Sequence, residues 1–189
     1  MIKKINYGYE KNFINVGTGI KHPNECRIIS ITYLLSYGIW ATDKGYDGIG
    51  NFLFRHSLEE RNHSIKFMEY ILNRGGKPTV TALKPADKDP KNMSDCFNQV
   101  FKHEVDNTEK IYNLVNMALE EKDWATWNFL QWFVKEQIEE ETLAMDLIDK
   151  LKIAGGEKAT DESLFNLDKE LGSAPDDADL ARDATSENP

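Results

Sequence analysis

The sequence has few cysteines, no long hydrophobic run and no excess of basic residues, and each shortage excludes a class of protein. The two cysteines among 189 residues, Cys26 and Cys96, form neither a disulfide framework nor a zinc-binding spacing. We expect both thiols to be small buried side chains. No stretch approaches the length of a membrane span, and residues 1–13 carry no apolar run of signal-peptide type. We therefore expect a cytoplasmic protein with no membrane partner.

Basic residues are outnumbered by acidic ones. The chain has 32 Asp and Glu against 23 Lys and Arg, a net charge of -9. A nucleic-acid surface needs basic patches that displace counterions, so we expect no nucleic-acid partner. An acidic chain suits a cation instead. With 40% hydrophobic residues, 189 residues are enough for one domain with a substantial core.

Hydrophobic periodicity and terminal signals predict an all-α chain. Pro23 is typical of the first position of a helix, and Gly75-Gly76 is typical of a helix end. Ser94 is a candidate N-cap for a later helix. The expected helices are Asn24 to about Thr42, roughly 48–74, from Ser94 to near Glu121, about 124–154, and a short one at about 161–171. Residues 1–22 are predicted to be an irregular lead-in, 23–171 the folded domain, and 172–189 a disordered acidic tail.

The lengths of the connections predict how the four long helices pack. The first pair is joined by the short loop DKGYDG, and the second by Lys122-Asp123. Between the pairs lies a segment of about 18 residues with three prolines, KPTVTALKPADKDPKNMS, which is long for a connection inside one domain. Two short connections around one long crossover indicate the ferritin-like variant of the four-helix bundle.

Acidic residues interrupt the apolar faces of three predicted helices. In the second helix Leu53, Glu60 and Phe67 are seven residues apart, with His56 and His63 between them. The corresponding face of the third helix comprises Phe97, Glu104, Ile111 and Ala118. The face of the fourth comprises Phe133, Gln137, Glu140, Ala144, Leu147 and Leu151. Each of the three helices therefore directs a carboxylate toward the core.

Isolated carboxylates in a core are costly, so they indicate bound cations. Burial of one unpaired carboxylate costs several kcal/mol or forces its protonation. Glu60 and His63 form a Glu-x-x-His pair one turn apart, the usual ligand arrangement of a di-iron bundle when carboxylates face it from other helices. Carboxylates bridge two metals, and imidazole suits a borderline metal such as iron. The run Glu139-Glu140-Glu141 cannot all face inward, because neighbouring residues point about 100° apart.

The sequence resembles non-haem bacterial ferritins from about Ile28 to Leu171. The resemblance is carried by FLFRHSLEERNHSIKFMEYILNRGG, by FKHE, by WNFLQWFVKEQIEEETLAMDLIDKL and by LFNLDKEL at the short last helix. It implies that iron is the metal bound, as Fe(II) and Fe(III) in a di-iron ferroxidase centre. It further implies that O2 or H2O2 oxidises Fe(II), and that ferric mineral grows inside a 24-mer homo-oligomeric cage.

The resemblance also assigns roles to individual residues. Glu60 matches the carboxylate that bridges the two irons, and His63 matches the imidazole ligand of the first. Glu104 and Glu140 match ligands of the second iron, with Gln137 lining the centre. Three further acids match a third iron site that shares Glu140: Glu59, Glu136 and Glu139. No haem is expected, since Arg61 stands where haem-containing relatives have methionine.

The first helix departs from the family pattern. Non-haem ferritins supply one more Glu there as a ligand of the first iron, whereas alignment places Arg27 or Cys26 at that position. Glu25 is the nearest acid and reaches the position only from an irregular helix start. The departure predicts weak or transient binding of the first iron, with the Arg27 guanidinium taking the place of a cation beside Glu60 if it points inward.

Three functions fit these observations. The first is a ferroxidase that stores iron. The second is a storage or assembly subunit whose ferroxidase centre is impaired, which the first-helix departure favours. The third is a different di-iron carboxylate enzyme on the same bundle. The LFNLDKEL segment favours the first two, because the family's fifth helix belongs to shell assembly.

Overall fold

The computed structural model describes residues 23–78 and 88–173, and in residues 23–29 it describes the backbone alone. The predicted lead-in, residues 79–87 of the crossover and residues 174–189 of the predicted tail lie outside this part of the chain, whereas Gly172, where the tail was predicted to begin, is the last residue of α5. The described residues form the following helices: α1 Pro23–Asp43, α2 Asp47–Asn73, α3 Met93–Glu120, α4 Trp124–Ile153, the 3-10 turn η1 Gly156–Lys158, and α5 Asp161–Gly172. The five α-helices confirm the predicted all-α ferritin-like bundle, and each long helix begins and ends within two residues of its prediction.

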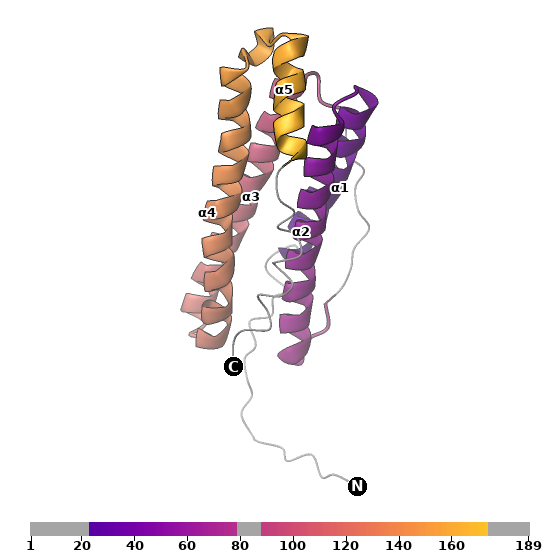
Figure 1. Cartoon of the computed structure of the whole chain (residues 1–189). Coiled ribbons are helices and arrows are strands. Elements are labelled where there is room, and N and C mark those ends of the chain that lie inside the picture. Colours follow the sequence, from indigo (N-terminus) through magenta and orange to yellow (C-terminus); the bar gives the residue numbers. More distant parts are fainter. Residues whose placement is uncertain (1–22, 79–87, 174–189) are drawn as a thin grey trace, which may run out of the picture.

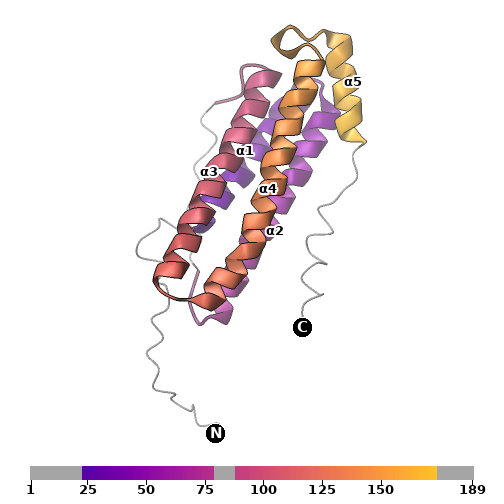
Figure 2. The same ribbon diagram turned by 90° about the vertical axis from the view of Figure 1, so that its left-hand side faces the viewer.

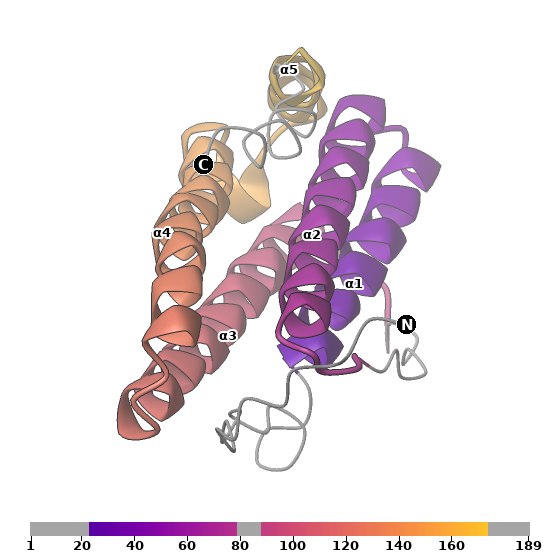
Figure 3. The same cartoon turned by 90° about the horizontal axis from the view of Figure 1, so that it is seen from below.

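The four long helices form two antiparallel hairpins (Figure 1). One consists of α1 and α2, and the other of α3 and α4, which lie side by side in two views (Figures 1 and 2). Seen from below, the α3–α4 pair lies beside the α1–α2 pair, and α5 is seen nearly end-on, outside the four long helices (Figure 3). No helix among the described residues is long and apolar enough to cross a membrane.

Side-chain caps fix the starts of the later helices. The predicted cap at Ser94 is wrong by two residues, because Asn92 is the N-cap of α3 and its side chain accepts a hydrogen bond from the Asp95 N–H. An Asn at this position has an acceptor oxygen that reaches the third residue of the helix, as a Ser does. Asp123 caps α4 in the same way and also accepts two hydrogen bonds from Arg74 of α2, at 3.0 and 3.1 Å. That ion pair joins α2 to α4 at one end of the bundle.

The fifth helix packs on α2 with almost no space between the two backbones. A Cβ atom added to Gly48 would lie 1.9 Å from the Asp168 carbonyl oxygen, so a side chain at Gly48 is excluded. The Asp168 carboxylate accepts a 2.8 Å hydrogen bond from the Ile49 N–H in the first turn of α2. Leu167 and Leu171 of α5 are buried in the core. The fifth helix is therefore part of the folded domain.

The apolar core consists of two clusters, one toward each end of the bundle. The upper cluster contains Leu53 of α2, Phe97 and Val100 of α3, and Leu147 of α4, and it includes the two α5 leucines. The lower cluster comprises Phe67, Ile111, Leu114, Ala118, Leu130 and Phe133. On α2, α3 and α4 the buried residues between the clusters are mainly polar, and they form the candidate site.

Candidate metal centre

A layer of buried polar side chains separates the two apolar clusters. Its members are Ser30 of α1, His56, Glu60 and His63 of α2, Glu104 and Asn107 of α3, and Gln137 and Glu140 of α4, each 5% exposed or less. Every acid that the apolar faces predicted to point inward is among them. Carboxylates from three helices thus meet in the middle of the bundle, where the desolvation cost of a charge is greatest.

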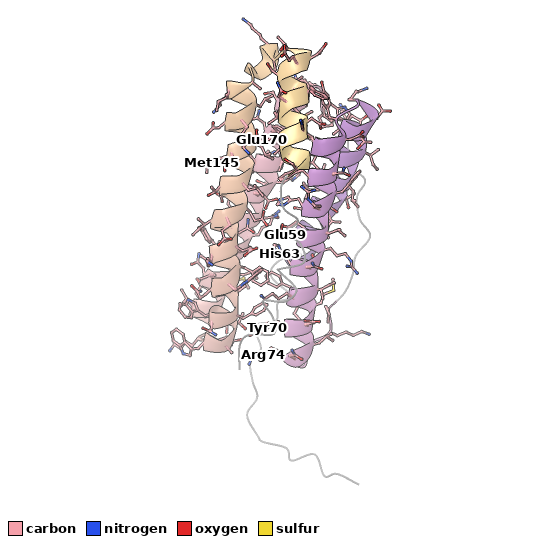
Figure 4. The ribbon with its side chains drawn as sticks, in the orientation of Figure 1. Glu59, His63, Tyr70, Arg74, Met145 and Glu170 are labelled. Atoms are coloured by element: carbon pink, nitrogen blue, oxygen red, sulfur yellow. The ribbon has the colours of Figure 1, made fainter. Side chains whose placement is uncertain are left out.

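On the side of the layer formed by α2 and α4, each imidazole faces two carboxylates. His63 Nδ1 lies 3.4 Å from Glu60 Oε1, and its Nε2 lies 3.3 Å from Glu136 Oε1. His56 Nε2 lies 3.1 Å from Glu140 Oε2, and its Nδ1 lies 3.6 Å from Glu59 Oε2. Because the two histidines are seven residues apart on α2, they occupy the same face of the helix. In Figure 4, Glu59 and His63 lie near the middle of α2.

These contacts shift the protonation of the buried groups. Burial raises the pKa of Glu140 to about 8, against the lowering effect of His56 and with further increases from Glu104 and Glu60. Burial acts to lower the pKa of His56, but Glu140 and Glu59 outweigh it and raise that pKa to about 10. The hydrogen bond from His56 lowers the pKa of Glu59. Such opposed shifts among neighbouring groups are typical of functional sites.

Toward α1 and α3, the hydrogen bonds to Glu104 that the described residues show are donated by neutral amides. The Asn107 carboxamide Nδ2 donates to Ser30 Oγ at 3.1 Å and to Glu104 Oε2 at 3.2 Å. From α4, Gln137 Nε2 lies 3.4 Å from the same Glu104 oxygen and 3.3 Å from the main-chain oxygen of Glu104. Glu104 is therefore oriented by amides, whereas Glu140 and Glu60 contact imidazoles.

Four of the side chains can hold a metal ion together. One ligand atom from each of Glu59, His63, Glu136 and Glu140 lies within 4.8 Å of the others. Among the described residues, Oε1 of the buried Glu140 has no hydrogen-bond partner. A cation would satisfy this oxygen, and three carboxylates with one imidazole are a donor set that suits a borderline divalent metal such as iron. The residues present therefore fit such an ion.

The predicted site residues fall into two groups. Seven are brought together in or beside the polar layer: Glu59, Glu60, His63, Glu104, Glu136, Gln137 and Glu140. Glu139 lies apart from them, because its side chain is 63% exposed and pairs with Lys135 at 3.4 Å. The side chains of Glu25, Cys26 and Arg27 lie outside the described residues, so the first-helix departure stays a prediction.

Sequence reasoning missed part of the layer. The spacing on α2 placed His56 on the face that carries Glu60 without indicating its partners, and in the structure it is buried against two of the candidate ligands, Glu140 and Glu59. Asn107 was not anticipated. Its position three residues after Glu104 places it on the same helix face, and that spacing was the available signal. Ser30 is the side chain that α1 contributes to the layer, and no sequence pattern indicated it.

Comparisons with known proteins agree with the fold. Residues 25–154 match the ferritin-like domain family. The chain is 36% identical over 132 residues to a bacterial non-heme ferritin of Escherichia coli, covering 70% of this chain and 78% of that protein. It is 37% identical over 121 residues to a bacterial non-heme ferritin of Campylobacter jejuni, covering 64% and 72%. The open pore ferritin of Archaeoglobus fulgidus superposes with a TM-score of 0.75 at 36% identity, covering 81% of this chain and 93% of that one.

Proposed function

The chain belongs to the ferritin-like domain family, and from that membership we propose that it stores iron by oxidising Fe(II) at the polar layer. In this proposal each Fe(II) gives one electron to O2 or H2O2, and the Fe(III) formed is deposited as mineral inside a homo-oligomeric 24-mer cage in the cytoplasm. Iron is thus the substrate and the cargo. The proposal needs no haem.

One observation carries the proposal: acids from three helices converge where the bundle is otherwise apolar. Glu60, Glu104 and Glu140 are each 3% exposed or less, and Glu140 has a raised pKa because of burial. Buried carboxylates at this density destabilise the fold unless cations neutralise them. Two divalent ions supply that charge, which makes the arrangement favourable when iron is bound.

The residues have distinct roles in this proposal. We assign Glu60 as the carboxylate shared by two ions, with the His63 imidazole 3.4 Å from it as a ligand of the first. We assign Glu104 of α3 and Glu140 of α4 as ligands of the second ion. Glu59 and Glu136 are less buried than the inner acids, with side chains 23% and 16% exposed. They therefore suit the transfer of an ion between the centre and solvent.

A second candidate function is supported by α1. Between Ser30 and Asp43, where the side chains of α1 are described, the single acid is Asp43 at the far end of the helix. In the described residues the α1 side chain that reaches the layer is Ser30, three residues after Arg27, which the resemblance places at the family's glutamate position. A storage or assembly subunit with an impaired centre would bind the first iron weakly and rely on partner subunits for oxidation. A different di-iron enzyme is the third possibility, and the docked α5 is an argument against it.

Stopped-flow oxidation of Fe(II) by the purified protein separates these functions. We expect oxidation much faster than that of Fe(II) in buffer, and a large assembly in size-exclusion chromatography. A rate equal to that of buffer, together with intact shells, would support the impaired subunit. A small oligomer that oxidises Fe(II) would support the third possibility instead.

A further inference from the structure

We propose that Asn107 is a positioning residue that holds the Glu104 carboxylate in the orientation in which it binds iron. The inference deepens the proposed function and rests on it. Asn107 is 3% exposed and lies one helical turn after Glu104. Its carboxamide nitrogen is within hydrogen-bond distance of Glu104 Oε2, at 3.2 Å, and of Ser30 Oγ, at 3.1 Å.

The geometry gives each amide hydrogen of Asn107 one acceptor. An amide NH2 group carries two hydrogens, so one can point to Glu104 and the other to α1. The contact with Ser30 therefore limits rotation of the carboxamide and fixes the direction from which it donates to Glu104. The Asn107–Ser30 contact joins α3 to α1 at the level of the polar layer.

A second amide acts on the same oxygen of Glu104. Gln137 Nε2 lies 3.4 Å from Glu104 Oε2, so the carboxylate is approached on that oxygen from α3 and from α4. Two donors on one oxygen restrict the rotation of the carboxylate, with the shorter contact coming from Asn107. Groups that orient metal ligands in this way typically change metal affinity by about 10- to 100-fold when they are removed.

Asn107 is a neutral amide, unlike the histidines that contact the other inner acids. Glu140 and Glu60 are contacted by His56 and His63, whose charge depends on protonation. Asn107 cannot take or lose a proton, so it orients Glu104 without competing as a positive charge with an incoming cation. Its effect should therefore be on the binding of iron, with little effect on electron transfer once iron is bound.

The alternative is that Asn107 merely connects α1 to α3. The chain offers a matched control for that role, because Tyr37 of α1 donates a 2.6 Å hydrogen bond to Gln99 Oε1 of α3. Gln99 lies eight residues before Asn107, about 12 Å along the helix, and contacts none of the acids in the described structure. Loss of either link removes a side-chain hydrogen bond between the same two helices.

The test compares Asn107→Leu, Asn107→Ala and Gln99→Leu with the unaltered assembled protein. For the Asn107 variants we expect the KM for Fe(II) to rise about 10-fold while kcat changes less than about 2-fold. For Gln99→Leu we expect an unchanged KM with a lower Tm. The visible spectrum of bound Co2+, a probe of the ligand geometry, should change in the Asn107 variants and stay the same in Gln99→Leu.

The outcomes separate this inference from the function on which it rests. If the unaltered protein neither oxidises Fe(II) nor binds Co2+, the proposed function fails. If the unaltered protein does both, and the Asn107 variants keep its KM and its Co2+ spectrum while their Tm falls as in Gln99→Leu, Asn107 is only a helix connector and the inference is overturned. Asn107→Ala keeps the test valid if Asn107→Leu does not fold, because Ala removes the amide without adding bulk.

Discussion

The buried acids on the two sides of the polar layer contact side chains of different chemistry. Between α2 and α4 the acids contact His56 and His63, which can carry protons. Between α1 and α3 the contacts are an amide and a hydroxyl, from Asn107 and Ser30. The ionisable side concentrates the groups that a cation can bind, whereas the neutral side orients one acid and joins two helices. The side chains around one site thus differ in whether their charge can change with protonation.

The largest expected effect comes from removing an acid on the ionisable side. For Glu140→Ala we expect the rate of Fe(II) oxidation to fall by at least about 100-fold, more than is typical for loss of a group that only orients a ligand. Asp146→Ala is the control, because Asp146 is an exposed acid on the same helix. Stopped-flow absorbance of Fe(III) measures both variants. Equal rates in the two would show that Glu140 binds no reacting iron.

The second prediction concerns the pH dependence of stability without iron. The folded-state pKa values of Glu140 and His56 are raised to about 8 and about 10, above the ordinary values of 4.5 and 6.5. The folded chain therefore holds more protons than the unfolded chain, and stability is lost as pH rises between about 4.5 and about 10. We expect Tm to fall through this range.

The double variant His56→Gln, Glu140→Gln should flatten that fall in Tm, because both titrating groups are gone. Gln99→Leu, which alters a neutral contact between α1 and α3, should keep the slope of the unaltered protein. Thermal melts of iron-free protein at several pH values provide the measurement. A slope unchanged in the double variant would place the titration in other residues.

A smaller effect is expected on the neutral side. Ser30→Ala removes the α1 partner of a buried amide, and loss of one partner from a buried hydrogen bond costs about 1–3 kcal/mol of unfolding free energy. Because no titratable group is lost, the decrease should be the same at about pH 6 and about pH 9. Urea unfolding at the two pH values measures it. A loss that depends on pH would show that Ser30 affects the titration of the neighbouring acids.

The smallest effect is expected for Glu139. Family resemblance assigns Glu139 to a third iron site, but its side chain is 63% exposed and pairs with Lys135. We expect Glu139→Ala to change the rate of Fe(II) oxidation by less than about 2-fold, as is usual for an exposed ion pair away from a site. Glu136→Ala, at a position facing His63, is the comparison and should have the larger effect. The same stopped-flow assay reports both.

The sequence predicted the fold and the inward-facing acids because both depend on the spacing of residues within one helix. Glu60, Glu104 and Glu140 could be placed in the core from the apolar residues seven positions away. Contacts between helices depend on the rotation and height of one helix against another, which periodicity does not give. For this reason the partners of His56, the link from Asn107 to Ser30, and the exposure of Glu139 required the structure.

Local signals in the sequence were also ambiguous in one respect. Asn92 and Ser94 are both good N-cap residues, and the choice between them depends on where the crossover joins α3. The end of α2 and the short connection at Lys122-Asp123 had no such competitor. Lys122 has a φ of 56°, a left-handed conformation that such a tight turn between α3 and α4 requires.

The interruption of the apolar core by a polar layer has a consequence for the local stability of the bundle. An ion that binds the folded chain and not the unfolded one raises stability by mass action, in proportion to the logarithm of its free concentration. Without a bound cation the buried acids of the layer would repel one another, and we expect the middle of the bundle to unfold locally more often than its two apolar ends.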